Sequence, residues 1–228
     1  MRKSIKKYPF LLFFFLAISI ITNPSIAQSP EKMQVFYKSD YTRKIDSLEE
    51  RDGINKNFNI NIKLPVLTAL QYFPELDTVP IYFKRKKLGT IMAARPRLNF
   101  IFRKKSDRQY LILLNEKPCY GDSVFYNLSF NAQVGIIGHE LSHIDAYTHL
   151  SNFGIIAFGF RYLFMKKKIE KATDRMAIQH NLGWQLYDAR RQVLQNKSID
   201  KYYLHNKVSH YLSPEEILED TEKIHANK

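Results

Sequence analysis

The spacing of hydrophobic residues changes its period along the chain. Segments 40–50 and 65–73 carry apolar side chains at helical spacing, and Pro65 stands where a helix can begin. The region after them has β-branched and aromatic runs between turn-forming residues, which predicts strands at 81–83, 98–102, 110–114 and 124–130. From residue 131 the spacing is helical again, and Ser213 predicts the cap of a last helix. The pattern therefore predicts one α+β domain, in which a small and mostly antiparallel sheet is followed by helices.

The composition is that of a folded domain. The 228 residues are 45% hydrophobic and 25% charged, which is enough to bury a core and excludes a disordered tail or a collagen-like fibre. The single cysteine, Cys119, excludes an internal disulfide framework and a cysteine-based zinc knuckle. The net charge is +13, but the basic clusters at 84–87 and 103–105 are typical of solvated turns. Because we identify no helical or aromatic readout element, we do not expect a nucleic-acid partner.

The first 27 residues have the pattern of a secretory leader. Four basic residues precede the apolar run Phe10–Ile21, and Ser25 and Ala27 are small residues at the positions that a signal peptidase reads. The run is shorter than the ~20 apolar residues of a spanning helix, although an uncleaved anchor is the alternative. We therefore predict a signal peptide at 1–27 and one mature domain at 28–228, exported to the periplasm or to the cell exterior.

Candidate chemistry lies on the first helix after the predicted sheet. His139 and His143 are four residues apart, so both imidazoles lie on one side of the helix, with Glu140 beside them. Two histidines at this spacing, with a glutamate next to the first, are typical of a catalytic zinc site. We predict one Zn²⁺ ion held by His139 and His143.

A catalytic zinc needs a third protein ligand, and the sequence offers two candidates. One is Glu170, with Asp174 a turn later on the same helix face, where a second carboxylate can accept the N–H of a ligand imidazole. The other is His149, six residues after His143. A histidine there reaches the metal only if the chain turns sharply before it, and Ala146 does not favour that turn as glycine would. Glu170 is the preferred ligand.

The segment from His139 to His143, with the segment from Glu170 to Asp174, resembles the gluzincin zinc metallopeptidases, and most closely the HtpX-like peptidases and the small soluble minigluzincins. The resemblance covers about residues 131–190. It implies a zincin-like fold, zinc ligands His139, His143 and Glu170, a catalytic base at Glu140 and a supporting carboxylate at Asp174. Thr173 departs from the pattern, which usually has alanine at this position.

The activity that this resemblance implies is hydrolysis of a peptide bond. Zinc would activate a water molecule, and Glu140 would take its proton and pass it to the leaving amine. A further donor should stabilise the oxyanion, and His210 is preferred among five candidates, the others being Arg175, Tyr202, Tyr203 and His205. A peptide or protein substrate should pair with an edge strand of the sheet, for which 110–114 is the candidate.

Residues 153–168 combine apolar side chains with three consecutive lysines at the end. The stretch is too short to span a bilayer and contains Arg161, so it is either a buried helical arm or a patch that contacts a membrane surface. A second class of function follows from this reading, namely a zinc-binding scaffold or membrane-surface adaptor without turnover. The presence of Glu140 argues against that alternative.

Overall fold

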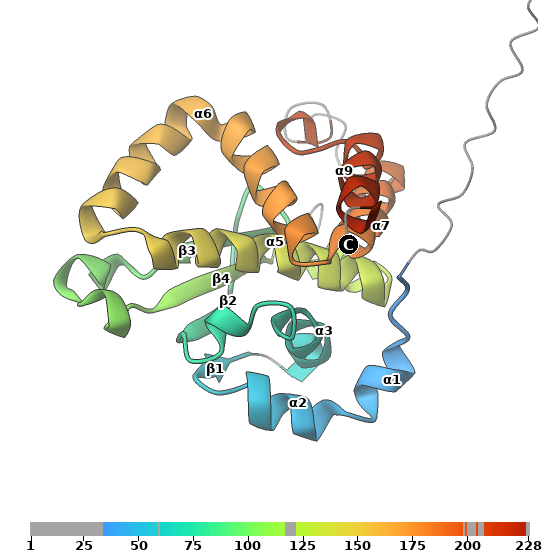
Figure 1. Ribbon diagram of the computed structural model, residues 1–228, viewed down its shortest axis with the longest axis horizontal. Coiled ribbons are helices and arrows are strands. Elements are labelled where there is room, and N and C mark those ends of the chain that lie inside the picture. The colour runs from blue at the N-terminus through green and yellow to red at the C-terminus, as the bar shows by residue number, and fades with distance from the viewer. Residues whose placement is uncertain are drawn as a thin grey trace, which may run out of the picture. The chain divides into compact units, whose positions relative to one another are not determined.

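The computed structural model describes residues 34–58, 60–116, 122–197, 199, 204 and 208–226 (Figure 1). They belong to one compact unit, Gln34–Lys228, that combines helices with a small four-stranded sheet, so the predicted α+β class is confirmed. The predicted signal peptide at 1–27 lies outside the described residues. Within the described part of the chain, no helix is both long enough and apolar enough to cross a membrane.

The sheet consists of β1 (Lys56–Asn57), β2 (Ile81–Lys86), β4 (Tyr110–Asn115) and β3 (Met92–Pro96), in that spatial order. The first two pairings are parallel and only β3 with β4 is antiparallel, so the predicted mostly antiparallel sheet is wrong. Strand β3 pairs with the edge of β4 that is away from β2. Strands β2 and β4 are therefore direct neighbours, and they run in the same direction.

Strand β4 is central and every residue of it is buried. The prediction that 110–114 is a substrate-accepting edge is therefore wrong, and β3 takes that place as an edge strand. The run that forms β3, Met-Ala-Ala-Arg-Pro, lacks the β-branched and aromatic residues that mark a strand in sequence, which explains why the pattern did not reveal it.

Two predicted strands are helical. Residues 98–102 form a 3₁₀ segment, η2 (Leu98–Phe102), in which only Phe100 is buried and the other apolar side chains face solvent. Residues 124–130 fall in α4 (Asp122–Tyr126), a turn and the start of α5. Their aromatic and branched side chains pack into the core from helices, so tertiary packing overrides their strand propensity.

The N-terminal region is also helical, with different bounds from those predicted. Segment 40–50 is divided into α1 (Lys38–Thr42) and α2 (Ile45–Asp52). Helix α3 (Ile60–Leu70) carries Pro65 in its interior, so the prediction that Pro65 begins a helix is wrong. Beyond α3, the short 3₁₀ segments η1 (Pro74–Leu76) and η3 (Lys105–Asp107) belong to the connections.

Helix α5 (Phe130–His149) crosses the middle of the unit and is buried over most of its length (Figure 1). Ser129 caps it by accepting a hydrogen bond from the backbone N–H of Ala132. Helix α7 (Gly183–Gln195) packs so closely on α5 that a Cβ at Gly135 would lie 2.2 Å from the carbonyl oxygen of Gln185. This close approach fixes α5 from the side of α7.

Helix α6 (Asn152–Gln179) bends at Met165, whose backbone is not helical. Figure 1 shows its first half rising away from α5 and its second half returning to it. Helix α9 (Pro214–Ala226) packs against α6 and α7, and η4 (Val208–His210) precedes it. Ser213 and Glu216 cap α9 reciprocally, as the sequence predicts.

Candidate metal centre

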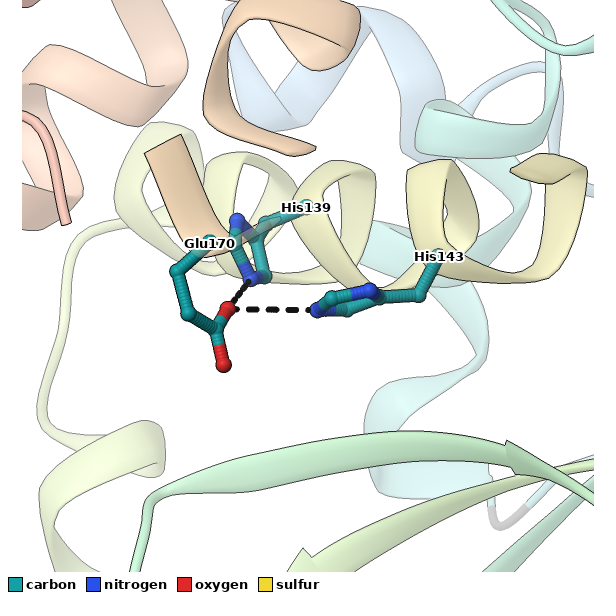
Figure 2. Close-up of side chains that lie close together, drawn as sticks. All are labelled: His139, His143 and Glu170. Atoms are coloured by element: carbon teal, nitrogen blue, oxygen red, sulfur yellow. Dashed lines mark hydrogen bonds and ion pairs between the residues drawn. The ribbon is translucent and has the colours of Figure 1, made fainter. Parts of the chain in front are cut away.

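Three side chains from α5 and α6 meet in a buried cluster. His139 and His143 extend from α5 toward Glu170 on the returning half of α6, as Figure 2 shows. The carboxylate oxygen Oε2 of Glu170 lies 3.1 Å from Nε2 of His139 and 3.2 Å from Nε2 of His143. A tetrahedral zinc ion with ligand bonds of about 2.0–2.2 Å separates its ligand atoms by roughly 3.3–3.5 Å. The two measured separations are slightly shorter than this range, and two imidazoles with one carboxylate are a donor set that zinc uses.

The bend at Met165 is what brings Glu170 to the histidines. Helix α6 begins three residues after α5 ends, and its first half leads away from the cluster. After the bend the helix passes α5 again, with the face that carries Glu170 and Asp174 directed to it. The two predicted motifs, 27 residues apart, are thus joined by a bent helical arm.

Asp174 holds the outer nitrogen of the first histidine. Its Oδ1 lies 2.8 Å from Nδ1 of His139, and its Oδ2 accepts a hydrogen bond from the backbone N–H of Leu212 at 2.8 Å. The guanidinium of Arg190 donates to both oxygens at 3.1 and 3.2 Å. Burial alone would raise the pKa of Asp174, but Arg190 and His139 outweigh it and lower that pKa. The ionised form of Asp174 accepts the N–H of Nδ1, which directs Nε2 of His139 toward Glu170.

Thr173 takes the corresponding position behind the second histidine. Its Oγ1 lies 3.3 Å from Nδ1 of His143 and also donates to the carbonyl oxygen of Ile169 at 3.0 Å. Since the hydroxyl has a single proton, it can only accept from His143. The threonine that departs from the family pattern therefore contacts a predicted ligand.

The charges in the cluster are strongly coupled. Burial alone would lower the pKa of His139, but Asp174 and Glu170 outweigh it and raise that pKa to about 10. Burial alone would raise the pKa of Glu170, but hydrogen bonds to His139 and His143 reverse this and lower that pKa. Without an ion, the site thus holds a protonated imidazole against carboxylates, and a bound cation would take over the charge of that proton.

Glu140 follows His139 on α5, and one of its carboxylate oxygens has no hydrogen-bond partner among the described residues. The side chain is buried, that oxygen is Oε2, and the backbone N–H of Ala94 in β3 donates to its carboxylate. Burial raises the pKa of Glu140 above its usual range. A buried carboxylate oxygen without a partner is uncommon in proteins, and a catalytic role or a bound water or ion is the usual explanation.

A cleft of about 440 Å³ opens onto the cluster. Edge strand β3, helix α5 and the first half of α6 line it, and Glu140, His139, His143 and Glu170 are also among its lining residues. Most of the remaining lining is apolar, with residues such as Met92, Leu98, Phe100, Ile155, Ile156 and Phe158.

Two tyrosines at the site were not predicted from the sequence. The Tyr162 hydroxyl donates a hydrogen bond to Oε1 of Glu170, which leaves Oε2 for the imidazoles. Burial, reinforced by the charge of Glu170, raises the pKa of Tyr162, so it remains a donor. The ring of Tyr211 lies edge-on to His139 with centroids 5.5 Å apart, and Arg190 stands 4.5 Å from its centroid. The available sequence signal was limited to their positions near Glu170 and His210.

The other predicted candidates lie elsewhere. His149 is 71% exposed at the end of α5 and contacts Asp145, so the structure does not bring it to the cluster. Arg175 forms a surface ion pair with Asp220. His210 lies in η4 and is not among the described residues that line the cleft, whereas its neighbour Tyr211 is. Tyr202, Tyr203 and His205 lie outside the described residues.

Comparisons of the chain with protein-family models, with curated proteins and with solved structures gave no match. Any functional assignment therefore depends on the residues and on the geometry described above.

Proposed function

We propose that this chain is a zinc-dependent metalloendopeptidase of gluzincin type, with one catalytic zinc ion held by His139, His143 and Glu170. The observation that carries the proposal is the buried Glu140, which lines the cleft together with both imidazoles and whose Oε2 has no hydrogen-bond partner among the described residues. A purely structural zinc site uses four protein ligands and has no need of such a group. A hydrolase needs it as the general base.

Zinc, when bound, polarises a substrate carbonyl and makes a water molecule acidic near neutral pH. Glu140 then accepts the proton of that water and delivers it to the nitrogen of the leaving amine. Burial raises the pKa of Glu140, which makes its carboxylate a stronger acceptor for the proton of the water molecule. Tyr211 replaces His210 as the preferred oxyanion donor, because it lines the cleft beside His139.

The substrate class follows from the cleft. An extended peptide can add to edge strand β3, whose Ala94 also holds Glu140. Its side chains would meet the apolar lining contributed by η2 and by the first half of α6. We therefore propose peptides or unfolded protein segments with apolar residues near the scissile bond as substrates.

The place of action is part of the same proposal. The predicted leader at 1–27 would direct the protein to the periplasm or the cell exterior. The first half of α6 exposes Phe153, Phe160, Leu163 and Phe164, and Lys167 and Lys168 follow them at the surface. The same half also has a buried side, with Ile155 buried and Phe158 packed against the core. For its exposed side we propose peripheral contact with an anionic membrane.

The test is cleavage of unfolded protein by the purified chain, its loss with a chelator and its return with zinc. Glu140→Gln should keep near-stoichiometric zinc and lose cleavage, because only the proton acceptor is removed. Glu50→Gln, an exposed glutamate on α2, is the matched control and should cleave normally. A wild-type protein that binds zinc and cleaves nothing would favour the scaffold alternative instead.

A further inference from the structure

A second group of metal-binding side chains lies on the other side of α5. Asp145 follows His143 by two residues, which places it about 200° around the helix axis and directs it away from the first cluster. Glu75 of η1 and His180 at the end of α6 meet it there. One ligand atom from each residue lies within 4.8 Å of the others.

His180 is held in the orientation of a ligand. Its Nδ1 donates a hydrogen bond to the carbonyl oxygen of Tyr72 at 2.7 Å, and its ring stacks on Phe73 with centroids 4.0 Å apart. This arrangement directs Nε2 toward Oε1 of Glu75 at 3.4 Å and Oδ2 of Asp145 at 3.9 Å. A backbone carbonyl on one ring nitrogen and carboxylates around the other is the usual support of a metal-bound imidazole.

The carboxylate of Asp145 is also directed toward Nε2 of His180. Its side chain is only 10% exposed, and its other oxygen, Oδ1, lies 3.2 Å from Nε2 of His149. His149 thus orients the carboxylate so that Oδ2 faces His180. The two carboxylates meet an imidazole here and not a lysine or an arginine.

We propose that Glu75, Asp145 and His180 form a second divalent-cation site, for zinc or a similar transition-metal ion. One imidazole with two carboxylates suits such an ion, whereas calcium and magnesium prefer oxygen ligands alone. The 3.4 Å between Oε1 of Glu75 and Nε2 of His180 matches the roughly 3.3–3.5 Å between ligands of a tetrahedral zinc, whereas Oδ2 of Asp145, at 3.9 Å from Nε2, has to move closer.

An ion at this second site would stabilise the packing of three elements of the fold. It would tie η1 and the end of α6 to α5, two residues from His143. Binding to the folded state alone stabilises that state in proportion to the logarithm of the ion concentration. The site does not depend on the proposed peptidase activity, because it shares no ligand with the first cluster.

The test is zinc stoichiometry after chelator treatment and equilibrium dialysis against micromolar ZnCl₂, read by elemental analysis. We expect two zinc ions per wild-type chain, one in Glu75→Gln, one in Glu170→Gln and none in the double variant. Glu75 is at the surface, so its variant should fold, and Glu50→Gln is the matched control with two ions. As a second readout, zinc should raise the melting temperature of Glu170→Gln but not that of the double variant.

The two proposals fail in different ways. A wild-type chain that binds one zinc, lost in Glu170→Gln and kept in Glu75→Gln, would overturn the second site. A single zinc that is lost only in Glu75→Gln would support the second site and count against the proposed catalytic centre. A Glu75→Gln variant that still binds two zinc ions would also overturn the second site.

Discussion

Oγ1 of Thr173 lies 3.3 Å from Nδ1 of His143, and its only proton points to the carbonyl oxygen of Ile169. The hydroxyl therefore acts as an acceptor that selects one tautomer of the histidine. The two imidazoles of the cluster are thus oriented from behind by different groups, an ionised aspartate for His139 and a neutral hydroxyl for His143.

The first prediction concerns this threonine. Thr173→Val keeps the shape of the side chain but removes the acceptor, so we expect zinc affinity to fall about 10- to 100-fold. Thr173→Ser keeps the hydroxyl and should retain wild-type affinity to within a few fold. Competition with a zinc chelator measures both. Equal affinities for the two variants would show that Thr173 only packs against His143.

The third ligand is tested by a pair of alanine variants. Glu170→Ala should remove the zinc of the first cluster, because two imidazoles alone do not hold a catalytic ion. His149→Ala should keep that zinc, since His149 is exposed and contacts Asp145. Elemental analysis in a Glu75→Gln background isolates the first cluster. The opposite pattern would require a chain turn after α5 that places His149 at the metal.

Two neighbouring residues, Tyr211 and His210, are the candidates for the oxyanion donor, and a pair of variants distinguishes them. Tyr211→Phe removes a hydroxyl from the cleft, and we expect kcat to fall roughly 10- to 1,000-fold with little change in KM. His210→Ala should have a much smaller effect, because His210 does not line the cleft among the described residues. Steady-state cleavage of a fluorogenic peptide gives both constants. A larger loss for His210→Ala would restore the prediction made from the sequence.

Zinc binding should depend on pH in a defined direction. Glu170 and Asp174 raise the pKa of His139 to about 10, so the metal-free site carries a proton at neutral pH that an ion must displace. Apparent affinity should therefore rise by about tenfold per pH unit from pH 6.5 to pH 9 and level off near pH 10. Calorimetry in buffers of different ionisation enthalpy should detect about one proton released per zinc. An affinity independent of pH over this range would contradict the assigned charge state.

The exposed face of α6 predicts binding to anionic membranes. Phe160 and Phe164 are 64% and 86% exposed, and exposed lysines follow them. Phe160→Asp with Phe164→Asp should reduce co-sedimentation with vesicles of anionic lipid by about tenfold or more, and salt should weaken the wild-type interaction. Ile54→Asp, an exposed apolar residue before β1, is the control. Equal binding of all variants would assign the interaction to another surface.

The core of the candidate site could be predicted from the sequence because its spacing is local. His139 and His143 share a helix face through one turn of α5, and Glu170 and Asp174 share another through one turn of α6. The contact of Tyr162 with Glu170 could not be predicted, because it depends on a bend at Met165 for which the sequence has no signal. Tyr211 follows a short 3₁₀ segment whose direction only packing decides.

The sheet was less predictable than the helices. Each strand is short, and the runs that form strands differ little from the apolar run of η2, whose side chains face solvent. The register and direction of the strands depend on which strands become neighbours. Strand β3 pairs with the outer edge of β4, but its composition is not typical of a strand. The antiparallel expectation therefore failed for a topological reason, whereas the α+β class followed from the change of period along the chain.

The bend of α6 connects an exposed apolar surface to the buried histidine–carboxylate cluster. The half before Met165 has apolar side chains that face solvent and others that line the cleft, and the half after it carries Glu170. Tyr162 on the first half is hydrogen-bonded to the carboxylate of Glu170. A displacement of the outer half would therefore move the Tyr162 hydroxyl relative to the carboxylate of Glu170. Contact at the exposed side of α6 would change the position of a hydrogen-bond donor to Glu170 without any partner entering the cleft.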